Sequence, residues 1–431
     1  MLDMLVADAR IDNKILSKKV SCIGLGYVGL PVATIVADAG FNVRGIDVAP
    51  KVVETLNTGS IHIVEPGLDE MFATAHAEGR ISASVTPEAA DIFIIAVPTH
   101  VDHDSKLPDM GHLKSAVESI AHVLKRGDLV IIESTIPVGC TEDAAKWLEA
   151  IRDDLMILPR EGAIREPDVM LAHCPERILP GVAMEELISN DRIIGGLTPQ
   201  AASAAAEFYN VFVEGDCHET SARVAEMCKL VENSYRDVNI AFANELSLLC
   251  DEAGIDTWEV IEKSSLHPRV NILQPGPGVG GHCIAIDPWY IVARSPELAR
   301  MIRTAREIND NKAHWVADQI RANVEGKDAP VISCLGLSYK PDIDDLRESP
   351  SITIIKDLAE SHPNATILAV EPHVDAMPRE LQGLDNVELV SWQDAAERAD
   401  VVALLVGHRE FRNAGLTALT NGKPLVEAVR I

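Results

Sequence analysis

Lys19-Val-Ser-Cys-Ile-Gly24-Leu-Gly26-Tyr-Val-Gly29 joins a short apolar run to a glycine-rich turn, and the helical pattern 30–39 follows directly. In a turn of this form the first glycine permits the tight bend, and the second lets the backbone approach a pyrophosphate. The third lets the helix pack closely on the strand, and the helix N-terminus favours phosphate charge. The stretch therefore predicts the first βα turn of a dinucleotide-binding sheet.

Asp47 closes the next apolar run, 18 residues after Gly29. A carboxylate at this point of such a sheet accepts a hydrogen bond from the adenosine ribose and selects NAD over NADP. The glycine spacing alone would also fit a plain strand-to-helix turn. Because strand, helix and acid occur in order, we predict that Gly24, Gly26, Gly29 and Asp47 bind NAD.

The 431 residues suggest a three-part organisation. Continuous apolar runs separated by helical patterns are typical of buried parallel strands. They occur at 20–23, 43–46, 92–97, 129–132 and 156–158, and again at 331–335, 366–370, 387–390 and 401–406. Residues 220–252 and 297–323, between the two groups, have helical patterns. The predicted class is α/β, with two Rossmann-like parallel-sheet domains flanking a helical middle domain with one long connecting helix.

We expect an N-terminal extension at 1–18, a NAD-binding domain at 19–215, a helical central and dimerisation domain at 216–325, and a C-terminal Rossmann-like domain at 326–431. The long helix contains no Pro or Gly. About 30 helical residues span roughly 45 Å, which exceeds one small domain. We therefore expect this helix to tie two domains together and to pack its apolar stripe against a second subunit.

The composition argues against some classes of partner. A net charge of −28, from 66 acidic and 38 basic residues, disfavours nucleic acid and anionic membranes. No apolar run reaches 18 residues and no signal-peptide pattern occurs, so we expect no membrane span. Eight scattered cysteines without a CxxC pair indicate reduced thiols in a cytoplasmic protein, and without metal-ligand spacing we expect no metal site.

One cysteine has an unusual setting, Gly276-Pro-Gly-Val-Gly-Gly-His-Cys283-Ile-Ala-Ile-Asp287. Four glycines precede the thiol, and glycines let a backbone come close to a ligand. A lone cysteine is most often a small buried hydrophobe. The glycines and Asp287 favour covalent chemistry instead, so beside a bound NAD we expect an oxidation that passes through a thioester at Cys283.

Several polar residues follow predicted strands, where ligands of open α/β sheets bind. Thr99 and Thr135 each follow a strand, and either could contact cofactor or water, or could cap the next helix. Glu176 and Arg177 share a Pro-rich loop. They could position a water and meet a phosphate or sugar, or they could form a surface ion pair.

The long helix carries Lys229, Asn233 and Arg236 on one face, with Glu226 on the same stripe. An amine and an amide that point together could donate to a developing oxyanion. The same spacing would also suit a solvated helix face.

Two more segments add basic side chains to this acidic chain. Arg269 offers the fork geometry that suits a pyrophosphate, and His267 could bind substrate or merely pack. The polar loop 335–350 follows a strand and contains Lys340 and Arg347. We read this loop as a second ligand-facing edge.

Together these motifs resemble the nucleotide-sugar 6-dehydrogenase family, the UDP-glucose/GDP-mannose dehydrogenases. The resemblance covers nearly the whole chain from Val20. It rests on GLGYVGLP, the Thr135 and Glu176 loops, Lys229 with Asn233, GGHC and YKPDIDDLRESP.

Within the family, the stretches 226–230, 237–247 and 267–283 look like the branch that acts on UDP-N-acetyl-D-mannosamine. The UDP-glucose enzymes typically carry a lysine just before the acid, where this chain has Ile286. The resemblance therefore implies UDP-N-acetyl-D-mannosamine as the substrate, with UDP-glucose or another UDP-N-acetylhexosamine as the alternative.

The resemblance also implies roles for single residues. The catalytic residues are Cys283, Lys229, Asn233, Asp287, Glu176 and Thr135. The NAD contacts are Gly24, Gly26, Tyr27, Val28, Gly29, Asp47, Thr99, Thr135 and Arg347. The UDP-sugar contacts, some from the partner subunit of a homodimer, are Arg177, Ile178, Lys229, Asn233, Arg236, His267, Arg269, Gly280, Tyr339 and Lys340.

In the implied reaction, two NAD are reduced for each sugar. C6 becomes an aldehyde, Cys283 captures it, a second oxidation gives a thioester, and water releases the carboxylate, a precursor for surface polysaccharide. Either Lys229 or Asp287 could be the first base. Two rivals stay open, a two-electron hydroxyacid dehydrogenase that needs no thiol and a non-catalytic NAD-binding protein.

Overall fold

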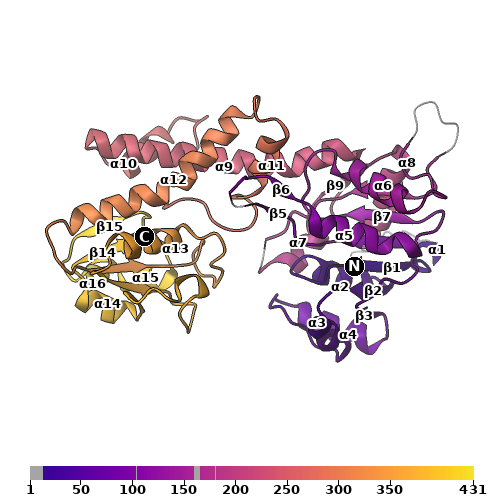
Figure 1. The fold of residues 1–431 in the computed structure, drawn as a ribbon, viewed down its shortest axis with the longest axis horizontal. Coiled ribbons are helices and arrows are strands. Elements are labelled where there is room, and N and C mark those ends of the chain that lie inside the picture. The colour runs from indigo at the N-terminus through magenta and orange to yellow at the C-terminus, as the bar shows by residue number, and fades with distance from the viewer. Residues whose placement is uncertain (1–12, 103, 160–165, 180) are drawn as a thin grey trace, which may run out of the picture. The chain divides into compact units, whose positions relative to one another are not determined.

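The computed structural model describes residues 13–102, 104–159, 166–179 and 181–431. The chain divides into two compact units, Met1–Leu230 and Val231–Ile431, and each contains one large sheet (Figure 1). The predicted α/β class, with two Rossmann-like sheets and a helical middle region, is confirmed.

The first unit is built on an eight-stranded sheet. Its strands are β1 (Lys19–Ile23), β2 (Asn42–Ile46), β3 (Ile81–Ser84), β4 (Ile92–Ile95), β7 (Leu129–Ile132), β8 (Met170–His173), β9 (Arg192–Gly196) and β10 (Cys217–Ser221). The order across the sheet is β10-β9-β8-β7-β4-β1-β2-β3, and only the β8–β9 pair is antiparallel. Within it, β3-β2-β1-β4-β7-β8 is the strand order of the Rossmann fold.

Helices connect these strands, and a small hairpin of β5 (His100–Val101) and β6 (Pro108–Asp109) follows β4. The helices are α1 (Asn13–Leu16), α2 (Gly29–Asp38), α3 (Pro50–Asn57), α4 (Leu68–Ala77), α5 (Gly111–Ile120), the 3-10 turn η1 (Ala121–Val123), α6 (Cys140–Ile151), α7 (Ala183–Ser189) and α8 (Pro199–Tyr209).

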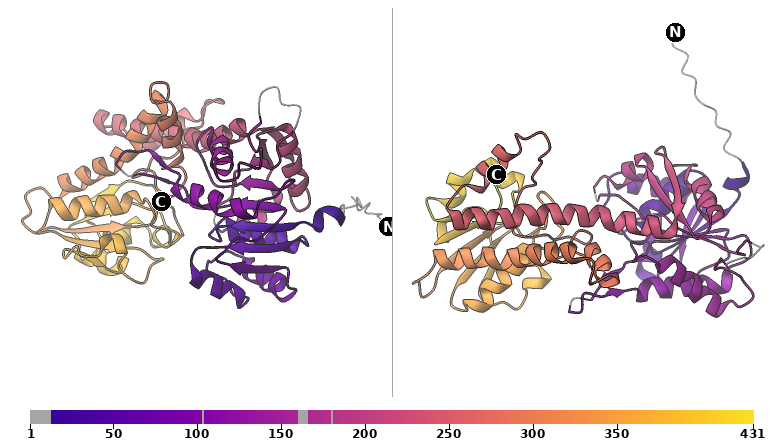
Figure 2. Two further views of the ribbon diagram at one scale, coloured as in Figure 1. Left: turned by 45° about the vertical axis from the view of Figure 1, so that its right-hand side comes forward. Right: turned by 90° about the horizontal axis from the view of Figure 1, so that it is seen from above.

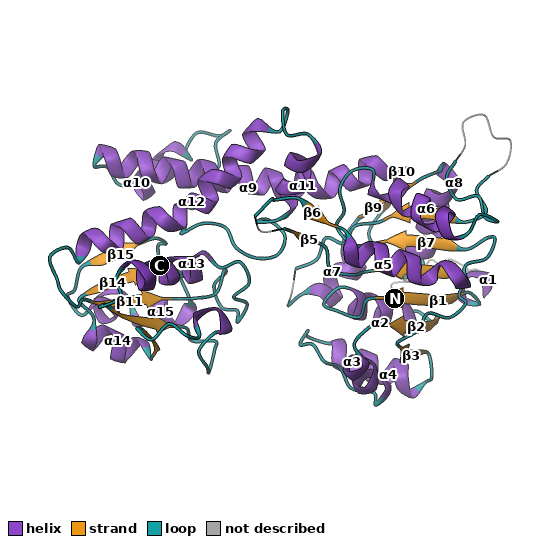
Figure 3. Cartoon of the chain, in the orientation of Figure 1, coloured by secondary structure: helices purple, strands orange, loops and turns teal. Residues whose placement is uncertain are grey.

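Both faces of the sheet are covered by helices (Figure 3). Successive residues of a strand point to opposite faces. Accordingly, Ile92 and Ile94 pack in one core with α2, α4 and α8, whereas Phe93 and Ile95 pack in another with α5 and α6. Burial on both faces explains why the strand sequences are continuously apolar.

The predicted strand at 156–158 is wrong, since these residues form no strand in the described structure. The Asp168 carboxylate accepts the Met156 N–H at 3.0 Å, and Glu149 accepts the N–H groups of Ile157 and Leu158 at 2.7 and 2.8 Å. Side-chain carboxylates therefore bind the donors that a neighbouring strand would need. The strand that pairs with β7 is β8.

The second unit contains a five-stranded parallel sheet in the order β13-β12-β11-β14-β15, again of the Rossmann type. Its strands are β11 (Val331–Leu335), β12 (Thr366–Val370), β13 (Val387–Leu389), β14 (Val401–Leu404) and β15 (Leu425–Glu427). Its helices are α10 (Thr257–Ser264), α11 (Asp287–Arg294), α12 (Arg300–Asn323), α13 (Pro350–Ser361), η2 (Arg379–Leu381), α14 (Trp392–Arg398), α15 (Arg409–Ala414) and α16 (Leu416–Thr420).

The predicted long helix is α9 (Ala222–Ala253), which starts in the first unit and continues without a break into the second. In the second unit α12 runs beside it (Figure 2), joined by buried polar contacts. Arg306 donates to Asp237 at 2.5 Å, and both side chains are almost wholly buried. Lys312 donates to Ser247 at 2.7 Å, and burial lowers the pKa of Lys312 to about 7. Separating the helices would leave these buried polar groups without their partners, which is energetically costly. The contacts therefore fix the two helices to each other.

Among the described residues, none of the helices combines the length and the apolar character that crossing a membrane requires.

Candidate functional site

The turn after β1 has the geometry that a dinucleotide requires. Gly24 has φ +90°, and a Cβ at Gly29 would lie 1.8 Å from the Gly24 carbonyl oxygen, so neither position accepts a side chain. A Cβ at Gly26 would meet nothing within 4 Å, so the second glycine borders open space. Tyr27 is exposed and Val28 half-buried beside it, just before α2 begins.

Asp47 follows β2 directly and is half-buried. Its Oδ2 accepts the Leu25 N–H at 3.1 Å, and its Oδ1 accepts the Ala49 N–H at 2.9 Å. These bonds fix the carboxylate next to the glycine turn. A carboxylate has about four lone-pair positions, so acceptor capacity remains for ribose hydroxyls. The open glycine and the fixed acid together fit NAD.

Thr99 and Thr135 do not cap helices, contrary to the alternative considered for them. The residues before α5 and α6 are Met110 and Gly139. Both threonines are half-buried in loops after β4 and β7. Ser134 ties these loops together, because its Oγ accepts the Val97 N–H at 2.9 Å and donates to the Val97 carbonyl at 2.8 Å. The loop that carries Thr135 is therefore held against the loop that carries Thr99.

Glu226 has a different surrounding from the rest of its helix face. It is fully buried and accepts the Gly139 N–H at 2.7 Å, the Thr141 N–H at 2.8 Å and the Thr141 hydroxyl at 2.6 Å. Burial raises the pKa of its carboxyl, and these bonds oppose the rise. Glu226 therefore caps the first turn of α6 and anchors the start of α9.

Lys229 is 7% exposed, so the alternative of a solvated helix face is wrong for this residue. Its Nζ lies 3.8 Å from Glu176 Oε1, and the other carboxylate oxygen of Glu176 accepts the Ile178 N–H at 2.7 Å. Arg177 is exposed, and its Nη1 donates to the Asp191 carbonyl at 3.3 Å. Glu176 thus pairs with the helix lysine rather than with its neighbour in sequence.

His173, at the end of β8, was missed by the sequence interpretation. It is fully buried, and its Nδ1 donates to the Ile132 carbonyl at 2.8 Å. Within the described part of the chain, nothing hydrogen-bonds its Nε2. Burial lowers the pKa of His173 to about 3, and the charge of Lys229 contributes further. The available signal was weak, a single histidine where an apolar strand meets the loop of Glu176.

In the second unit, Cys283 is exposed, as expected for a reactive thiol. Its carbonyl accepts the N–H groups of Ile286 at 3.0 Å and Asp287 at 2.8 Å, which makes a tight turn into α11. By contrast, burial raises the pKa of Cys140, Cys174 and Cys334 to about 12. Exposure therefore separates Cys283 from these buried thiols.

Asp287 and Asn233 come together across the second unit. The Asn233 Nδ2 donates to Asp287 Oδ2 at 2.5 Å, and Asp287 is only 3% exposed. Asp287 is also the first residue of α11, where the helix dipole favours negative charge. Asn233 therefore orients the carboxylate of Asp287, which is four residues after Cys283 and joined to it by a tight backbone turn.

The glycines before the thiol approach the chain itself, whereas we expected them to approach a ligand. A Cβ at Gly280 would lie 2.6 Å from both Tyr339 Cβ and the Glu348 carbonyl oxygen. Gly281, with φ +82°, donates its N–H to the Arg347 carbonyl at 3.0 Å, and a Cβ there would meet the Tyr339 ring at 3.0 Å. The glycines therefore fit the Cys283 loop against the loop after β11.

Other predicted ligand-binding residues, for substrate or for NAD, lie on the surface. Arg236 on α9 is exposed, as are His267 and Arg269 after α10. Lys340 is exposed in the loop after β11, and Arg347 makes a bidentate pair with Asp345 at 2.9 and 2.6 Å. Two of these residues are in direct contact, since His267 Nδ1 accepts the Arg269 N–H at 3.3 Å.

Comparison with known proteins covers nearly the whole chain. Residues 18–213 match the NAD binding domain of the UDP-glucose/GDP-mannose dehydrogenase family, 223–311 its central domain and 333–431 its UDP binding domain. A relative from Ralstonia nicotianae, named NDP-N-acetyl-D-galactosaminuronic acid dehydrogenase, is 53% identical and covers 92% of each chain. The UDP-N-acetyl-D-mannosamine dehydrogenase of Yersinia pestis is also 53% identical, over 91% of this chain and 94% of that one.

Solved structures agree with this assignment. The UDP-N-acetyl-mannosamine dehydrogenase of Staphylococcus aureus is similar with a TM-score of 0.80 and 41% identity, over 93% of this chain and 92% of that one. The predicted family is confirmed, and so is the NAD cofactor, whose site the glycine turn and Asp47 fit. The chain belongs to the UDP-glucose/GDP-mannose dehydrogenase family, and it is an NAD-dependent nucleotide-sugar dehydrogenase.

Proposed function

We propose that the protein oxidises C6 of UDP-N-acetyl-D-mannosamine to the carboxylate in two steps through a covalent intermediate on Cys283. The observation that carries the proposal is the exposed Cys283 beside Asp287, a buried carboxylate oriented by Asn233 at 2.5 Å. The substrate is supported by the relatives from Yersinia pestis and Staphylococcus aureus, both named for UDP-N-acetylmannosamine. The product is a nucleotide-linked uronic acid, which suits a precursor of surface polysaccharide.

A second candidate substrate is a nucleotide-linked N-acetylgalactosamine. The Ralstonia nicotianae relative is named for the corresponding uronic acid, and it is as similar in sequence as the Yersinia pestis relative. The two sugars differ in the orientation of ring hydroxyl and N-acetyl groups, while the chemistry at C6 is the same. The same catalytic residues therefore serve either substrate.

In the first oxidation a base takes the proton of the C6 hydroxyl, and either Lys229 or Asp287 fills this role. Lys229 and Asn233 lie one turn apart on the unbroken helix α9. Bound NAD supplies the hydride acceptor for each of the two oxidations. Burial of Lys229 and Asp287 keeps competing water away from both groups.

Cys283 then captures the aldehyde. Its sulfur forms a bond to C6, the carbonyl oxygen becomes an alkoxide, and a proton completes the thiohemiacetal. Loss of a second hydride and of the hydroxyl proton converts this adduct to a thioester. Lys229 and Asn233 donate to the oxygen as its charge develops. Asn233 has a second amide N–H for this purpose, because its contact with Asp287 uses one of two.

Hydrolysis completes the reaction. Water adds to the thioester carbon, the C–S bond breaks, and the thiol and the carboxylate are released. Glu176 and Thr135 hold this water in the proposal. Glu176 is 12% exposed and fixed by Ile178 and Lys229, so it can orient a water without swinging away.

Ligand binding uses further residues in this proposal. NAD contacts Gly24, Gly26, Tyr27, Val28, Gly29, Asp47, Thr99, Thr135 and Arg347. The UDP-sugar contacts Arg177, Ile178, Lys229, Asn233, Arg236, His267, Arg269, Gly280, Tyr339 and Lys340. We keep the regions 19–215, 216–325 and 326–431 as the cofactor, central and UDP-binding parts.

We also propose a homodimer that forms through α9. Several large apolar side chains of the helix are exposed, with exposed fractions of 47% for Val231, 71% for Tyr235 and 56% for Phe242. Its buried face carries polar groups such as Asp237 and Asn244 beside apolar residues such as Leu230. A second copy of the same helix would cover the exposed stripe, and the exposed Arg269 could then reach the partner's substrate.

A cytoplasmic location is part of the proposal. In the described structure the eight cysteines form no disulfide bond, which is usual where thiols are kept reduced.

The test is to count NADH per sugar with UDP-N-acetylmannosamine, UDP-N-acetylgalactosamine and UDP-glucose in separate reactions. Two NADH from the mannosamine derivative alone are expected. Two from the galactosamine derivative alone would move the assignment to the second candidate. One NADH per sugar from any substrate would contradict the thioester route.

A further inference from the structure

Each of the two sheets has an acidic residue directly after its second strand, Asp47 after β2 and Glu371 after β12, but the two acids have different partners. Asp47 follows β2 and accepts the N–H of Leu25, whereas Glu371 follows β12 and accepts the N–H of Leu337 at 2.7 Å. Each acid also accepts the N–H two residues further on, which for Glu371 is His373 at 3.1 Å. In a dinucleotide-binding sheet this acid serves the ribose.

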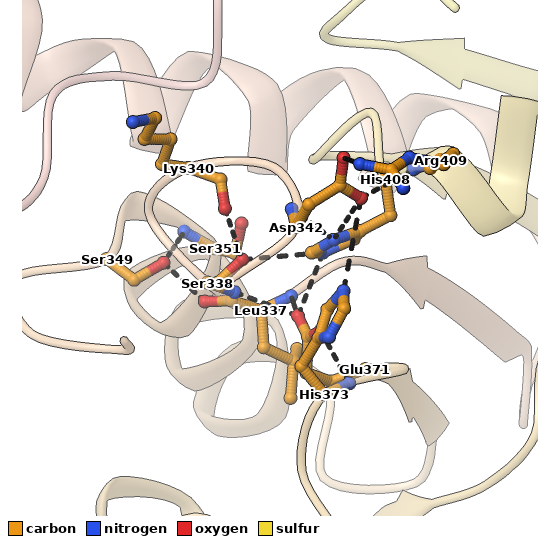
Figure 4. Close-up of polar contacts among 10 residues, drawn as sticks. All are labelled: Leu337, Ser338, Lys340, Asp342, Ser349, Ser351, Glu371, His373, His408 and Arg409. Atoms are coloured by element: carbon orange, nitrogen blue, oxygen red, sulfur yellow. Dashed lines mark hydrogen bonds and ion pairs between the residues drawn. The ribbon is translucent and has the colours of Figure 1, made fainter. Parts of the chain in front are cut away.

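Glu371 has further partners that occupy it fully (Figure 4). Its Oε2 also accepts the Ser338 N–H at 3.0 Å and lies 3.1 Å from His408 Nε2. Glu371 is 5% exposed. Burial alone would raise the pKa of this carboxyl, but the hydrogen bonds from His408 and the backbone bring the pKa below its usual value. The acid is therefore an ionised anchor for the start of the loop 337–349.

His408 extends the anchor to the middle of the loop. It is fully buried, and its Nδ1 accepts the Asp342 N–H at 3.0 Å while Nε2 faces Glu371 (Figure 4). Nε2 therefore carries the proton and donates to Glu371. Because both ring nitrogens are engaged, His408 is not available as a metal ligand, although Asp342 and His373 lie near it.

The same loop lies against the Cys283 loop. Ser349 Oγ donates to the Leu337 carbonyl at 2.6 Å, which closes the base of the loop 337–349. In this loop, the backbone carbonyl of Arg347 accepts the Gly281 N–H at 3.0 Å, and the ring of Tyr339 lies next to Gly281. A shift of the loop by a few tenths of an ångström would therefore change the position of the turn that presents Cys283.

We propose that Glu371 and His408 are positioning residues for Cys283, which act by holding the loop 337–349 against Gly280 and Gly281. The proposal builds on the nucleophilic role of Cys283 proposed above. Neither residue touches substrate or thiol. They make the loop a rigid support, so the turn that carries the thiol keeps one position.

Two variants of the full-length protein test this role. Glu371→Gln keeps the shape but turns one acceptor into a donor that faces backbone N–H groups. His408→Asn keeps an acceptor for the Asp342 N–H but loses the bond to Glu371, and it decides the question if Glu371→Gln does not fold. Asn386→Ala is the control. It removes hydrogen bonds of 3.2 and 3.3 Å to the carbonyls of Ala359 and His362, in the same unit but outside the loop.

The readouts are deuterium uptake by peptide and the rate at which iodoacetamide alkylates Cys283, followed by mass spectrometry. In both variants we expect faster uptake at 280–283 and 337–342, and an alkylation rate changed by about threefold or more. We also expect kcat/KM for the UDP-sugar to fall about tenfold. The control should match the wild type in uptake at 280–283 and in alkylation.

Wild-type uptake and alkylation in a folded variant would overturn the proposal. Equal changes in Asn386→Ala would also overturn it, because they would show general loosening of the unit. Neither measurement uses turnover, so both decide the question even if no UDP-sugar is oxidised and the proposed function fails.

Discussion

Asn233 on α9 donates its amide to Asp287 at the start of α11, with 2.5 Å between Nδ2 and Oδ2. The acid is 3% exposed and the amide is half-buried. A buried carboxylate is stable only when it is hydrogen-bonded, and here the bond also sets its direction. Asn233 therefore has two functions in the proposed mechanism, since it orients Asp287 and offers its other N–H to the oxyanion.

Asn233→Asp should therefore lower the activity strongly, although the two side chains are nearly equal in size. Two carboxylates at this distance share one proton at neutral pH, so an ionised Asp287 requires higher pH. We expect the acidic limb of the kcat/KM profile to move up by about one pH unit or more. Asn233→Ser, which adds no charge, should lower kcat without moving that limb. A profile of Asn233→Asp that overlays the wild type would contradict the pairing.

Cys283→Ser should abolish the second oxidation. A serine hydroxyl is a far weaker nucleophile than a thiolate, so we expect kcat to fall roughly a thousandfold or more. Any residual turnover should stop at the aldehyde and yield one NADH per sugar, measured by absorbance against sugar consumed. Cys217→Ser, a half-buried thiol on β10, is the control and should retain two NADH. Full activity in Cys283→Ser would favour the two-electron rival.

Gly281→Ala should disturb the contact between the Cys283 loop and Tyr339. The new Cβ would lie 3.0 Å from the Tyr339 ring, and φ +82° adds about 1 kcal/mol of backbone strain. Gly383→Ala is a matched control, because Gly383 has φ +91° but nothing within 4 Å of the added Cβ. We expect a lower kcat/KM only for Gly281→Ala. Similar urea midpoints with similar activities in both variants would show that the contact does not matter.

His173 predicts how stability depends on pH. Its folded pKa of about 3 lies below the usual value of 6.5, so the unfolded chain binds the proton first as pH falls. The contribution of neutral His173 to the free energy of unfolding is fully present above about pH 6.5. It is lost progressively toward pH 3, with about 2 kcal/mol lost at pH 5.

His173→Asn removes this titration and keeps a donor for the Ile132 carbonyl. Urea unfolding at pH 7.5 and pH 5 should show a smaller loss of stability on acidification in the variant than in the wild type. Equal losses in the two proteins would mean that His173 is not held neutral.

Phe242→Glu should separate the proposed dimer. Phe242 is 56% exposed on the apolar stripe of α9, and a charge there would be buried by a second copy. Light scattering should give a dimer for the wild type and a monomer for the variant. Leu298→Glu, 85% exposed and outside α9, should remain dimeric. A monomeric wild type, or a dimeric Phe242→Glu, would exclude this interface.

The sequence by itself determined the first ligand site and the most apolar strands. Gly24, Gly29 and Asp47 are positions where local turn geometry requires a particular residue, and continuous apolar runs marked β1, β2, β4, β7, β11, β12, β13 and β14. No such run marked β3, β8, β9, β10 or β15, and the run at 156–158 forms no strand. Its apolar residues suit a strand, but Glu149 and Asp168 bind its backbone, and no local pattern records which donors a distant carboxylate will take.

Only the tertiary structure decided how the chemical groups combine. Asn233 meets Asp287 across 54 positions, and Lys229 meets Glu176 rather than solvent. Gly280 and Gly281, before Cys283, lie in close contact with Tyr339, a residue of the distant loop after β11. Spacing on one helix shows which side chains share a face, but their partners depend on which elements pack against that face. That packing is a property of the whole fold, so a single segment cannot reveal it.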